Sequence, residues 1–537
     1  MTGVCRSTSI QNCRAQFIWD QPMSSTQAGC QSLTFNQVWL IISLALAFHI
    51  VPLLMADQLY LDDYWRTVLA ENDWTSQGRP LTAALLAFLG FANGAPNIYP
   101  LPLLLALPIV GYSLARLGRH WYSTPSVAHV LVLLPLWYQP FFLQNLSYQF
   151  DGTGMALALV ASILAITVTT EAIKYWFLGC LLVATAVAFY QVAVNVFIGL
   201  CCLDIMRQVM DGASFSSVRR QATQRLTQLI AGCLLYYAAC SRMITVPRGS
   251  LLTFDGHWPE LIIGRLSDVC ADLRLLATPQ TTLFMDALLV LASIALVTEL
   301  ACLWQRPCSR WEQLGLTVAL SLPVPVIYVS ITGVMLLFAD YDHAARTLMG
   351  FGVACVLVLS LVQRALMRLP RIQIAILLIP SLFMLSIAFA YGRVQSMQKE
   401  LNQALAHSIA QDLFSGNGLG SLDHYYLDGH WISQRWLPSA QGLFRTLPVL
   451  THVQGVNGYA MLLPEMLTFA GVANVGPALG GSAPMSRQQV LDLSPTPVVE
   501  RALYEIHRVD NTGYVLMKAP PANSAAPSHT HPGQRRE

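Results

Sequence analysis

The sequence predicts an all-α polytopic membrane protein with a small α/β domain near its C-terminal end. The first observation is composition: of 537 residues, 54% are hydrophobic and 11% are charged, whereas soluble domains carry roughly a quarter charged residues. The second is that apolar runs of near membrane-spanning length recur between residues 38 and 391. The third is a change after Tyr391, where a helical stretch is followed by short strand-like pieces separated by Gly, Asn and Pro.

The apolar runs predict about eleven transmembrane helices, because a helix needs roughly 20 apolar residues to cross the hydrocarbon core. The fifth and sixth runs are short and also fit one broken or re-entrant hairpin. The predicted spans are residues 38–56, 99–117, 126–143, 153–170, 175–190, 192–206, 226–243, 283–303, 314–338, 347–362 and 372–391.

Positive charge in alternate connections predicts the orientation of these spans. Cytoplasmic loops collect Lys and Arg, and the basic connections fall on one side if the N-terminus is cytoplasmic. An odd number of spans then places the C-terminal region on the outer side. The basic residues are Arg116, Arg119, Lys174, Arg207, Arg219, Arg220, Arg225, Arg306, Arg310, Arg364, Arg368 and Arg371.

The chain outside the spans predicts three further regions. Residues 1–36 are polar and contain no cleavable signal peptide pattern, which predicts a cytoplasmic segment before a transmembrane domain at 37–391. Residues 392–520 predict an outer domain, in which 502–509 and 514–518 flank a turn-rich DNTG and form a hairpin. Residues 521–537 are rich in Pro, Ser and Ala and are expected to be disordered.

Charge and motifs exclude several functions. A net charge of +2 is too small to indicate a nucleic-acid partner. The sequence has neither a Gly-rich phosphate loop nor a Walker-type lysine, so a nucleotide sugar is not the obvious substrate. The twelve cysteines show no metal-ligand spacing, and most of them lie in apolar runs or in the N-terminal segment.

The first outer loop carries the strongest candidate residues. Asp62 and Asp63 follow the first span within a few residues, and Arg66 lies one helical turn later. Adjacent carboxylates in a solvated loop are usually surface polarity, but ionisable groups beside a membrane exit are commonly functional. A carboxylate that accepts a hydroxyl proton, beside a guanidinium that holds phosphate, fits transfer from a phosphorylated lipid.

The same loop continues into GRPLTAALLAFLG, in which Pro80 is placed at a first helical turn. About a dozen apolar residues suit a helix in the membrane interface, which would hold Arg79 at the depth of a lipid-linked phosphate. The alternative is that Arg79 extends to water from an apolar surface.

Two other outer connections carry polar candidates. In NLSYQFDG, Asp151 lies between two spans, with Asn145 and Tyr148 as partners for sugar hydroxyls, although Asp151 equally suits a helix N-cap. In DYDHAARTLMG, Arg346 could bind phosphate or pair with a nearby aspartate, Asp340 or Asp342.

The last candidates are Tyr190 and Gln191 at the tip of the short hairpin, where Tyr is also a common interface residue.

These segments resemble those of the polytopic glucosyltransferases that decorate bacterial lipopolysaccharide O-antigen, a branch of the GT-C superfamily. The resemblance covers about residues 40–515. It is carried by DDYWR at 62–66, W-x3-GRPL at 74–81, PLPLLLALP from Pro100, NLSYQFD at 145–151, YQ at 190–191, R-x3-G at 346–350 and the helix exit AYGRVQSMQKELNQALAHSIAQDL.

The resemblance implies a GT-C fold in the bacterial inner membrane, with a periplasmic active site and C-terminal domain. It implies inverting transfer of a sugar, typically glucose, from undecaprenyl phosphate to a saccharide acceptor. Asp62 or Asp63 is then the general base, and Asp151 assists it or orients the acceptor. Arg66, Arg79 and Arg346 bind the phosphate, and Trp74 adds a substrate contact. Relatives often carry Arg or Lys where this chain has Gln149.

Several alternatives stay open. Another GT-C transferase could move mannose or aminoarabinose, or modify lipid A or protein. A divalent cation, Mg²⁺ or Mn²⁺, could bridge the carboxylates and phosphate. A lipid-linked-sugar transporter is less favoured, because it would place ionisable residues near the bilayer midplane rather than at helix ends on one face. A noncatalytic scaffold would leave the outer Asp and Arg residues replaceable.

Overall fold

The computed structural model describes residues 32–168, 172–246, 249–253, 256–416, 418–428, 436–455, 464–476 and 484–518. Most of the predicted cytoplasmic segment 1–36 and the predicted disordered tail 521–537 lie outside these ranges. The chain divides into two compact units, Met1–Val51 with Asn72–Ala388 and Pro52–Glu71 with Phe389–Glu537. The first outer loop therefore groups with the C-terminal region.

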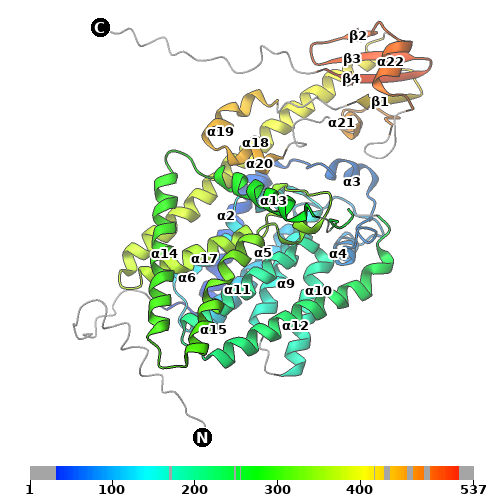
Figure 1. Ribbon diagram of the computed structural model, residues 1–537. Coiled ribbons are helices and arrows are strands. Elements are labelled where there is room, and N and C mark those ends of the chain that lie inside the picture. Colours follow the sequence, from blue (N-terminus) through cyan, green and yellow to red (C-terminus); the bar gives the residue numbers. More distant parts are fainter. Residues whose placement is uncertain are drawn as a thin grey trace, which may run out of the picture. The chain divides into compact units, whose positions relative to one another are not determined.

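The described residues of the first unit form helices joined by loops, with an isolated β-bridge between Leu251 and Phe338 (Figure 1). Its helices are α2 (Phe35–Ala56, whose last turn enters the second unit), α4 (Pro80–Gly90), α5 (Leu101–Trp121), α6 (Val127–Leu133), α7 (Pro135–Tyr138), α8 (Phe142–Ser147), α9 (Asp151–Thr167), α10 (Ile173–Phe189), α11 (Val194–Met210), α12 (Phe215–Cys240), α13 (Trp258–Arg274), α14 (Thr282–Trp304), α15 (Arg310–Ser321), α16 (Pro323–Val329) and α17 (Phe351–Ala365). Short 3-10 turns are η1 (Gln191–Ala193), η2 (Ser241–Met243), η3 (Gly333–Leu337) and η4 (Ala345–Thr347), and α18 (Pro370–Phe414) runs on into the second unit.

Every predicted span contains helix, which confirms a polytopic membrane protein without fixing the number of crossings. Among the described residues, six stretches are long and apolar enough to span a membrane: Phe35–Ala56, Leu101–Trp121, Gln191–Met210, Thr282–Trp304, Arg310–Val329 and Pro370–Phe414. Five further apolar helices are shorter: Pro80–Gly90, Val127–Tyr138, Asp151–Thr167, Ile173–Phe189 and Phe351–Ala365.

Helix α9 lies at the centre of the packing in the first unit, and its first residue is the candidate Asp151. It packs against α4, α5, α10 and α11 and is buried along most of its length. Gly154, in its first turn, lets α4 approach closely, because a Cβ there would lie 2.5 Å from Thr82 Oγ1. Helix α4 begins at Pro80 as predicted, where the missing N–H of proline costs no helical hydrogen bond.

The other end of α9 is closed by arginine. Arg225 donates from Nη1 to the Ala165 carbonyl at 2.8 Å and from Nη2 to the Ile166 carbonyl at 2.6 Å, so it satisfies carbonyls that the helix end leaves open. Arg207 is also buried and donates to the Trp121 carbonyl at 2.6 Å. Two arginines used to predict the orientation are therefore part of the packed interior.

The second unit contains a four-stranded sheet and short helices (Figure 1). The strands are β1 (His424–Asp428), β2 (Val499–Glu500), β3 (Tyr504–Val509) and β4 (Thr512–Met517), in the order β1-β4-β3-β2. Strand β1 is parallel to β4 and the other pairs are antiparallel, which confirms the predicted hairpin. The helices are α3 (Asp63–Leu69), η5 (Pro438–Ala440), α19 (Gln441–Thr446), α20 (Val449–Gln454), α21 (Pro464–Phe469) and α22 (Arg487–Leu493).

One face of α18 builds the core of this unit. Ile409 and Leu413 pack with Ile506 and Val515 of the sheet, and Tyr64 of α3 enters the same cluster. Burial of such side chains is the main stabilising contribution for a small domain. The loop after the first span is thus folded into the core of the C-terminal region.

Asp412 fastens α18 to β3. Its Oδ1 accepts a 2.6 Å hydrogen bond from Arg501 Nη2, and its Oδ2 accepts from Arg501 Nε at 2.9 Å and from the Tyr504 hydroxyl at 2.6 Å. These hydrogen bonds, led by those from Arg501, lower the pKa of the Asp412 carboxyl against the opposing effect of burial. A lowered folded-state pKa stabilises the protein above the pKa of the unfolded state, and this stability is lost as pH falls through the folded-state value.

We therefore expect Asp412→Asn to lower the melting temperature of the purified full chain at pH 6, and the difference from wild type to shrink as pH falls below about 4. Differential scanning fluorimetry in detergent between pH 3 and pH 6 measures this. Asp423→Asn, at an exposed carboxylate of the same unit, is the control. A melting-temperature difference between Asp412→Asn and wild type that stays constant from pH 3 to pH 6 would contradict the stabilising role assigned to the Asp412 carboxylate.

Candidate active site

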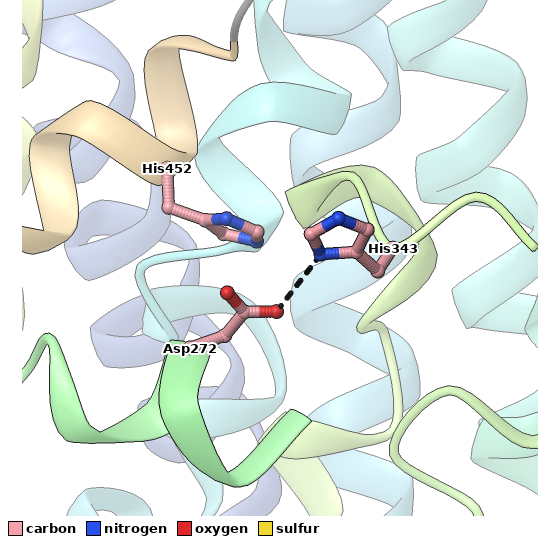
Figure 2. Close-up of side chains that lie close together, drawn as sticks. All are labelled: Asp272, His343 and His452. Carbon is pink, nitrogen blue, oxygen red and sulfur yellow. Dashed lines mark hydrogen bonds and ion pairs between the residues drawn. The ribbon is translucent and has the colours of Figure 1, made fainter. Parts of the chain in front are cut away.

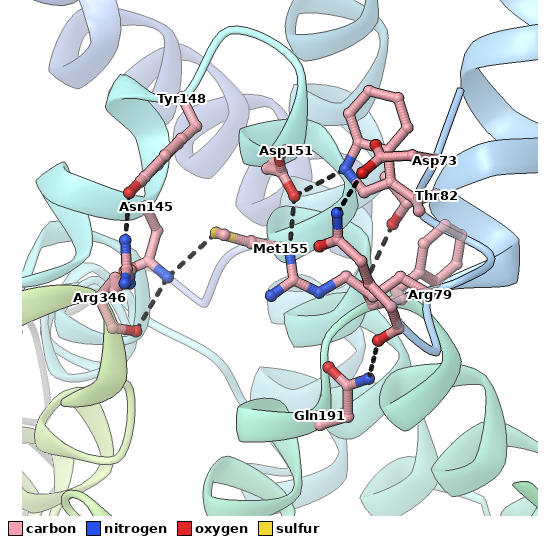
Figure 3. Close-up of polar contacts among 12 residues, drawn as sticks. Asp73, Arg79, Thr82, Asn145, Tyr148, Asp151, Met155, Gln191 and Arg346 are labelled. Carbon is pink, nitrogen blue, oxygen red and sulfur yellow. Dashed lines mark hydrogen bonds and ion pairs between the residues drawn. The ribbon is translucent and has the colours of Figure 1, made fainter. Parts of the chain in front are cut away.

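A buried ion pair joins the start of α4 to the start of α9. Arg79 Nη1 lies 2.7 Å from Asp151 Oδ1, with side chains 12% and 5% exposed. The same carboxylate oxygen accepts a 2.9 Å hydrogen bond from Trp74 Nε1 (Figure 3). Asp151 is the first residue of α9, after the N-cap residue Phe150, so its carboxylate faces Arg79 and Trp74 rather than serving as the predicted alternative, the N-cap.

Trp74 supports this pair from the interior. Its side chain is fully buried, and its ring stacks on Phe150 with centroids 6.1 Å apart. Ala83, Leu86 and Ala95 complete the apolar cluster around it. Trp74 therefore holds Asp151 in place and presents no open surface to a ligand.

The Arg79 guanidinium lies over the ring of Tyr190, 4.9 Å from its centroid. A desolvated cation on an aromatic face is attracted by about 2 kcal/mol. The ion pair and this stacking account for the low exposure of Arg79, which does not extend to water as the alternative expected. Among the described residues, Arg79 Nε has no hydrogen-bond partner, so the guanidinium has donor capacity beyond Asp151.

The turn before Arg79 is fixed by side chains that donate hydrogen bonds to its backbone carbonyls. Gln191 Nε2 donates to the carbonyls of Gln77 at 3.2 Å and Gly78 at 3.1 Å, and the Tyr236 hydroxyl donates to the Gly78 carbonyl at 2.8 Å. Gly78 has φ of +77°, and a Cβ there would lie 2.6 Å from Tyr236 Oη. Both the conformation and the close approach require glycine.

Arg346 is held in a second polar group. Its Nη2 pairs with Asp342 Oδ2 at 3.0 Å, and its Nη1 hydrogen-bonds the Tyr148 hydroxyl. Its backbone N–H donates to Gln144 Oε1 at 2.7 Å, and its carbonyl accepts from Asn145 Nδ2 at 3.1 Å. The pairing with Asp342 that the sequence left open is present, and the side chain of Arg346 is still 33% exposed.

The two groups meet at Tyr190. The charges of Arg79 and Arg346 both act on its phenol, as do those of Asp151 and Asp342. Asn145 Nδ2, which binds the Arg346 carbonyl, also lies 3.2 Å from Met155 Sδ on α9, between the two groups (Figure 3). Two guanidiniums, a phenol and amide groups are thus assembled at helix ends, a set of donors suited to an oxyanion.

The acidic loop belongs to the second unit. Asp63 is fully buried and begins α3, and its Oδ2 accepts a 3.0 Å hydrogen bond from the Tyr60 backbone N–H. Asp62 is partly exposed, and Arg66 is buried with its guanidinium 4.7 Å from the Trp65 ring centroid. The approach of this loop to Arg79 and Arg346 stays a prediction.

Sequence reasoning missed Gln144 and Tyr236, which fix the backbone of Arg346 and Gly78. Gln144 directly precedes the NLSYQFDG segment and Tyr236 lies in the predicted span 226–243, so neither was part of a motif used in the sequence analysis. Gln149 accepts a 2.9 Å hydrogen bond from Asn97 Nδ2 and adds no positive charge.

His343 fastens the loop of Arg346 to α13. Its Nδ1 lies 3.3 Å from Asp272 Oδ2 (Figure 2). This hydrogen bond, with the charge of Asp272, raises the pKa of His343 against the effect of burial. A raised folded-state pKa gives a link that is fully present below the unfolded value of about 6.5 and is lost as pH rises through the folded-state value.

We expect the transfer rate of wild type to fall more steeply than that of His343→Gln as pH rises above about 6.5. The ratio of the two rates should change by no more than about fivefold over this range, because exposed pairs contribute at most about 1 kcal/mol. Initial rates between pH 6 and pH 9 measure this. His257→Gln is the matched control. His257 Nδ1 lies 3.3 Å from the carboxylate of Glu260, three residues later in the chain, so loss of this contact would not free the loop of Arg346. Parallel profiles for wild type and His343→Gln would contradict the link.

The fold and this polar group define a polytopic helical membrane protein with a charged site assembled at helix ends. Comparison with protein families then gives the particular class: residues 51–399 match the family described as glucosyl transferase GtrII. The chain belongs to this family. The matched range includes every candidate residue from Asp62 to Arg346.

One similar curated protein is an uncharacterized 55.3 kDa protein in the gtrB 5′ region of Salmonella phage P22, which is 24% identical over 255 residues. The match covers 45% of this chain and spans about half, 51%, of that relative. No solved structure matches the chain.

Proposed function

We propose that this glucosyltransferase moves glucose from a polyprenyl-phosphate donor, undecaprenyl phosphate glucose, to a saccharide of lipopolysaccharide O-antigen, with inversion at the anomeric carbon. The reaction would occur on the outer face of a bacterial inner membrane, with the N-terminus cytoplasmic. Membership of the GtrII family supports the glucose and the transfer. The positive charge of the predicted inner loops supports the orientation.

The observation that supports the donor class is that Arg79 stacks on the ring of Tyr190 and that the charges of Arg79 and Arg346 both act on its phenol. Arg79 follows a turn that is built around Gly78 and precedes an apolar helix with exposed Phe88. A guanidinium in this position suits a phosphate carried on a lipid, whose chain stays in the membrane. A freely diffusing nucleotide sugar would gain nothing from the apolar surroundings.

In the proposed reaction, Asp62 or Asp63 accepts the proton of an acceptor hydroxyl as its oxygen attacks the anomeric carbon of glucose. The bond between that carbon and the phosphate oxygen breaks, and its electron pair leaves with polyprenyl phosphate. The phosphate thereby gains one negative charge. Arg66, Arg79 and Arg346 stabilise this developing charge, which is the change that distinguishes the transition state from the bound substrate.

Asp151 acts in this scheme mainly through Arg79. A buried carboxylate fixes the guanidinium in one geometry before the donor arrives, and such preorganisation costs nothing at the moment of reaction. Asn145 and Tyr148, next to Arg346, are the proposed partners of sugar hydroxyls. Tyr190 supports the Arg79 guanidinium, while Trp74 and Gln191 hold its carboxylate partner and its turn.

The donors around Asp151 do not favour Mg²⁺ or Mn²⁺ at that residue. Its Oδ1 already accepts from Arg79 and Trp74, and a cation there would face a guanidinium directly. A divalent cation therefore remains a proposal only for the Asp62 and Asp63 carboxylates, and no step above depends on it.

Purified protein in proteoliposomes, offered undecaprenyl phosphate [14C]glucose and O-antigen saccharide, tests the donor and the reaction together. We expect the saccharide to become labelled without any added UDP-glucose. Parallel donors carrying mannose or aminoarabinose, and lipid A as acceptor, test the alternative transferases. Movement of the labelled lipid across the bilayer without any transfer would identify a transporter and overturn the proposal.

A further inference from the structure

We infer that the C-terminal region positions the acidic loop of the active site, and that Tyr60 is the residue through which it acts. This inference rests on the proposed function, in which Asp62 or Asp63 is the general base. It gives the C-terminal region a task that neither its family nor its sequence assigns. All the contacts that carry it lie within the second unit.

The loop contains two residues in unfavourable backbone conformations. Asp57 and Leu61 adopt left-handed backbone conformations, with φ of +43° and +47°, which cost side-chain-bearing residues of order 1 kcal/mol or more each. Helix α3 has only seven residues. Such a segment keeps one conformation only where its surroundings impose it.

The C-terminal region supplies these surroundings at three points. The first is Lys399 of α18, whose Nζ donates to the Asp57 carbonyl at 2.6 Å and lies 3.4 Å from the Ala56 carbonyl and from Asp57 Oδ2. One ammonium thus closes the C-terminal end of α2, where carbonyls lack helical partners.

The second point is Tyr64. It lies in the hydrophobic core with Ile409, its ring meets that of Phe469 edge to face at 5.9 Å, and its hydroxyl accepts a 3.0 Å hydrogen bond from Gln58. Tyr64 is adjacent to Asp63, so its anchoring fixes the first turn of α3 to α18 and α21.

The third point connects directly to a carboxylate. The Tyr60 hydroxyl donates to the Gln454 carbonyl at 2.8 Å, while the Tyr60 backbone N–H donates to Asp63 Oδ2 at 3.0 Å. Gln454 is itself fixed, because its Oε1 accepts a 3.1 Å hydrogen bond from Gln395 of α18. Tyr60 and Gln454 are both almost fully buried. One residue therefore joins the last residue of α20 to the Asp63 side chain.

Tyr60→Phe tests this connection, since it removes the hydroxyl and keeps the ring and the backbone N–H. We expect the kcat of the full chain in proteoliposomes to fall by about tenfold, as for a small misplacement of a catalytic group, with KM for the donor unchanged. Hydrogen exchange of a peptide covering residues 57–70 should increase at the same time. Tyr504→Phe is the matched control: it removes one buried hydroxyl from the same unit, bonded to Asp412 and Ser408, and should change neither quantity.

Lys399→Met and Lys399→Arg form a second pair. We expect Lys399→Met to lower kcat and raise exchange as Tyr60→Phe does, and Lys399→Arg, which keeps a cationic donor, to restore most of both. Wild-type kcat in Tyr60→Phe and Lys399→Met, or a lower kcat without any change in exchange at residues 57–70, would overturn the inference while leaving the proposed function intact. Full activity after replacement of both Asp62 and Asp63 by Asn would overturn the proposed function instead.

Discussion

Replacement of both Asp62 and Asp63 by Asn is expected to lower the rate of glucose transfer by at least about 100-fold, which is the lower end of what a positioned general base contributes. The single variants Asp62→Asn and Asp63→Asn should show which of the two carboxylates is the general base. The variant that removes the base loses most of the activity, whereas the other loses less. Initial rates with undecaprenyl phosphate glucose and O-antigen saccharide measure the effect.

The control for these variants is Asp268→Asn, which neutralises an exposed carboxylate on α13 and should leave the rate unchanged. Thermal unfolding of each purified variant shows whether the fold survives. Because Asp63 is buried, its replacement could also disturb α3, so the single Asp62 variant is the cleaner test. Full activity in both single variants and in the double variant would end the general-base proposal.

Replacement of Arg79 by Met is expected to lower kcat by about 100-fold to 1,000-fold, because one preorganised group that stabilises developing charge is lost. Arg79→Lys should keep the charge and lose the planar stacking on Tyr190, giving an intermediate rate. Single-turnover rates with bound donor measure the chemical step separately from donor binding.

Arg79→Met alone also leaves Asp151 buried without its cation, which costs about 3–5 kcal/mol in buried pairs. The double variant Arg79→Met with Asp151→Asn removes both charges, so we expect it to recover melting temperature and not activity. Arg225→Met is a matched control, since Arg225 is buried at the other end of α9; it should lower stability and spare the kcat of the folded fraction. Recovery of activity in the double variant would show that Arg79 serves only to neutralise Asp151.

The helices and the hairpin were accessible from sequence because their signals are local. Apolar runs of sufficient length place α2, α5 and α14 close to the predicted bounds, as well as the start of α18, which continues well beyond the predicted end at residue 391. The DNTG turn places β3 and β4. Pro80 likewise marks the start of α4. The number of membrane crossings was less accessible, because α6, α9, α10 and α17 are apolar but short.

The partners of the candidate residues were not accessible in the same way. Arg79 and Asp151 are 72 positions apart, and each had an equally good local explanation as a side chain extending to water or a helix cap. The resemblance implied a substrate contact for Trp74, yet Trp74 is fully buried and stacks on Phe150. Local patterns report exposure to lipid or water, while these side chains are fixed by distant segments.

By itself, the sequence determined that this protein is a multi-pass membrane protein whose charges gather at helix ends, because hydrophobicity and helix-breaking residues act over short stretches of chain. The tertiary structure alone decided that Arg79 pairs with Asp151 and stacks on Tyr190, and that Asp62 and Asp63 lie on a loop held by the C-terminal region. These contacts depend on which buried polar groups find partners after packing, and that is a property of the whole fold.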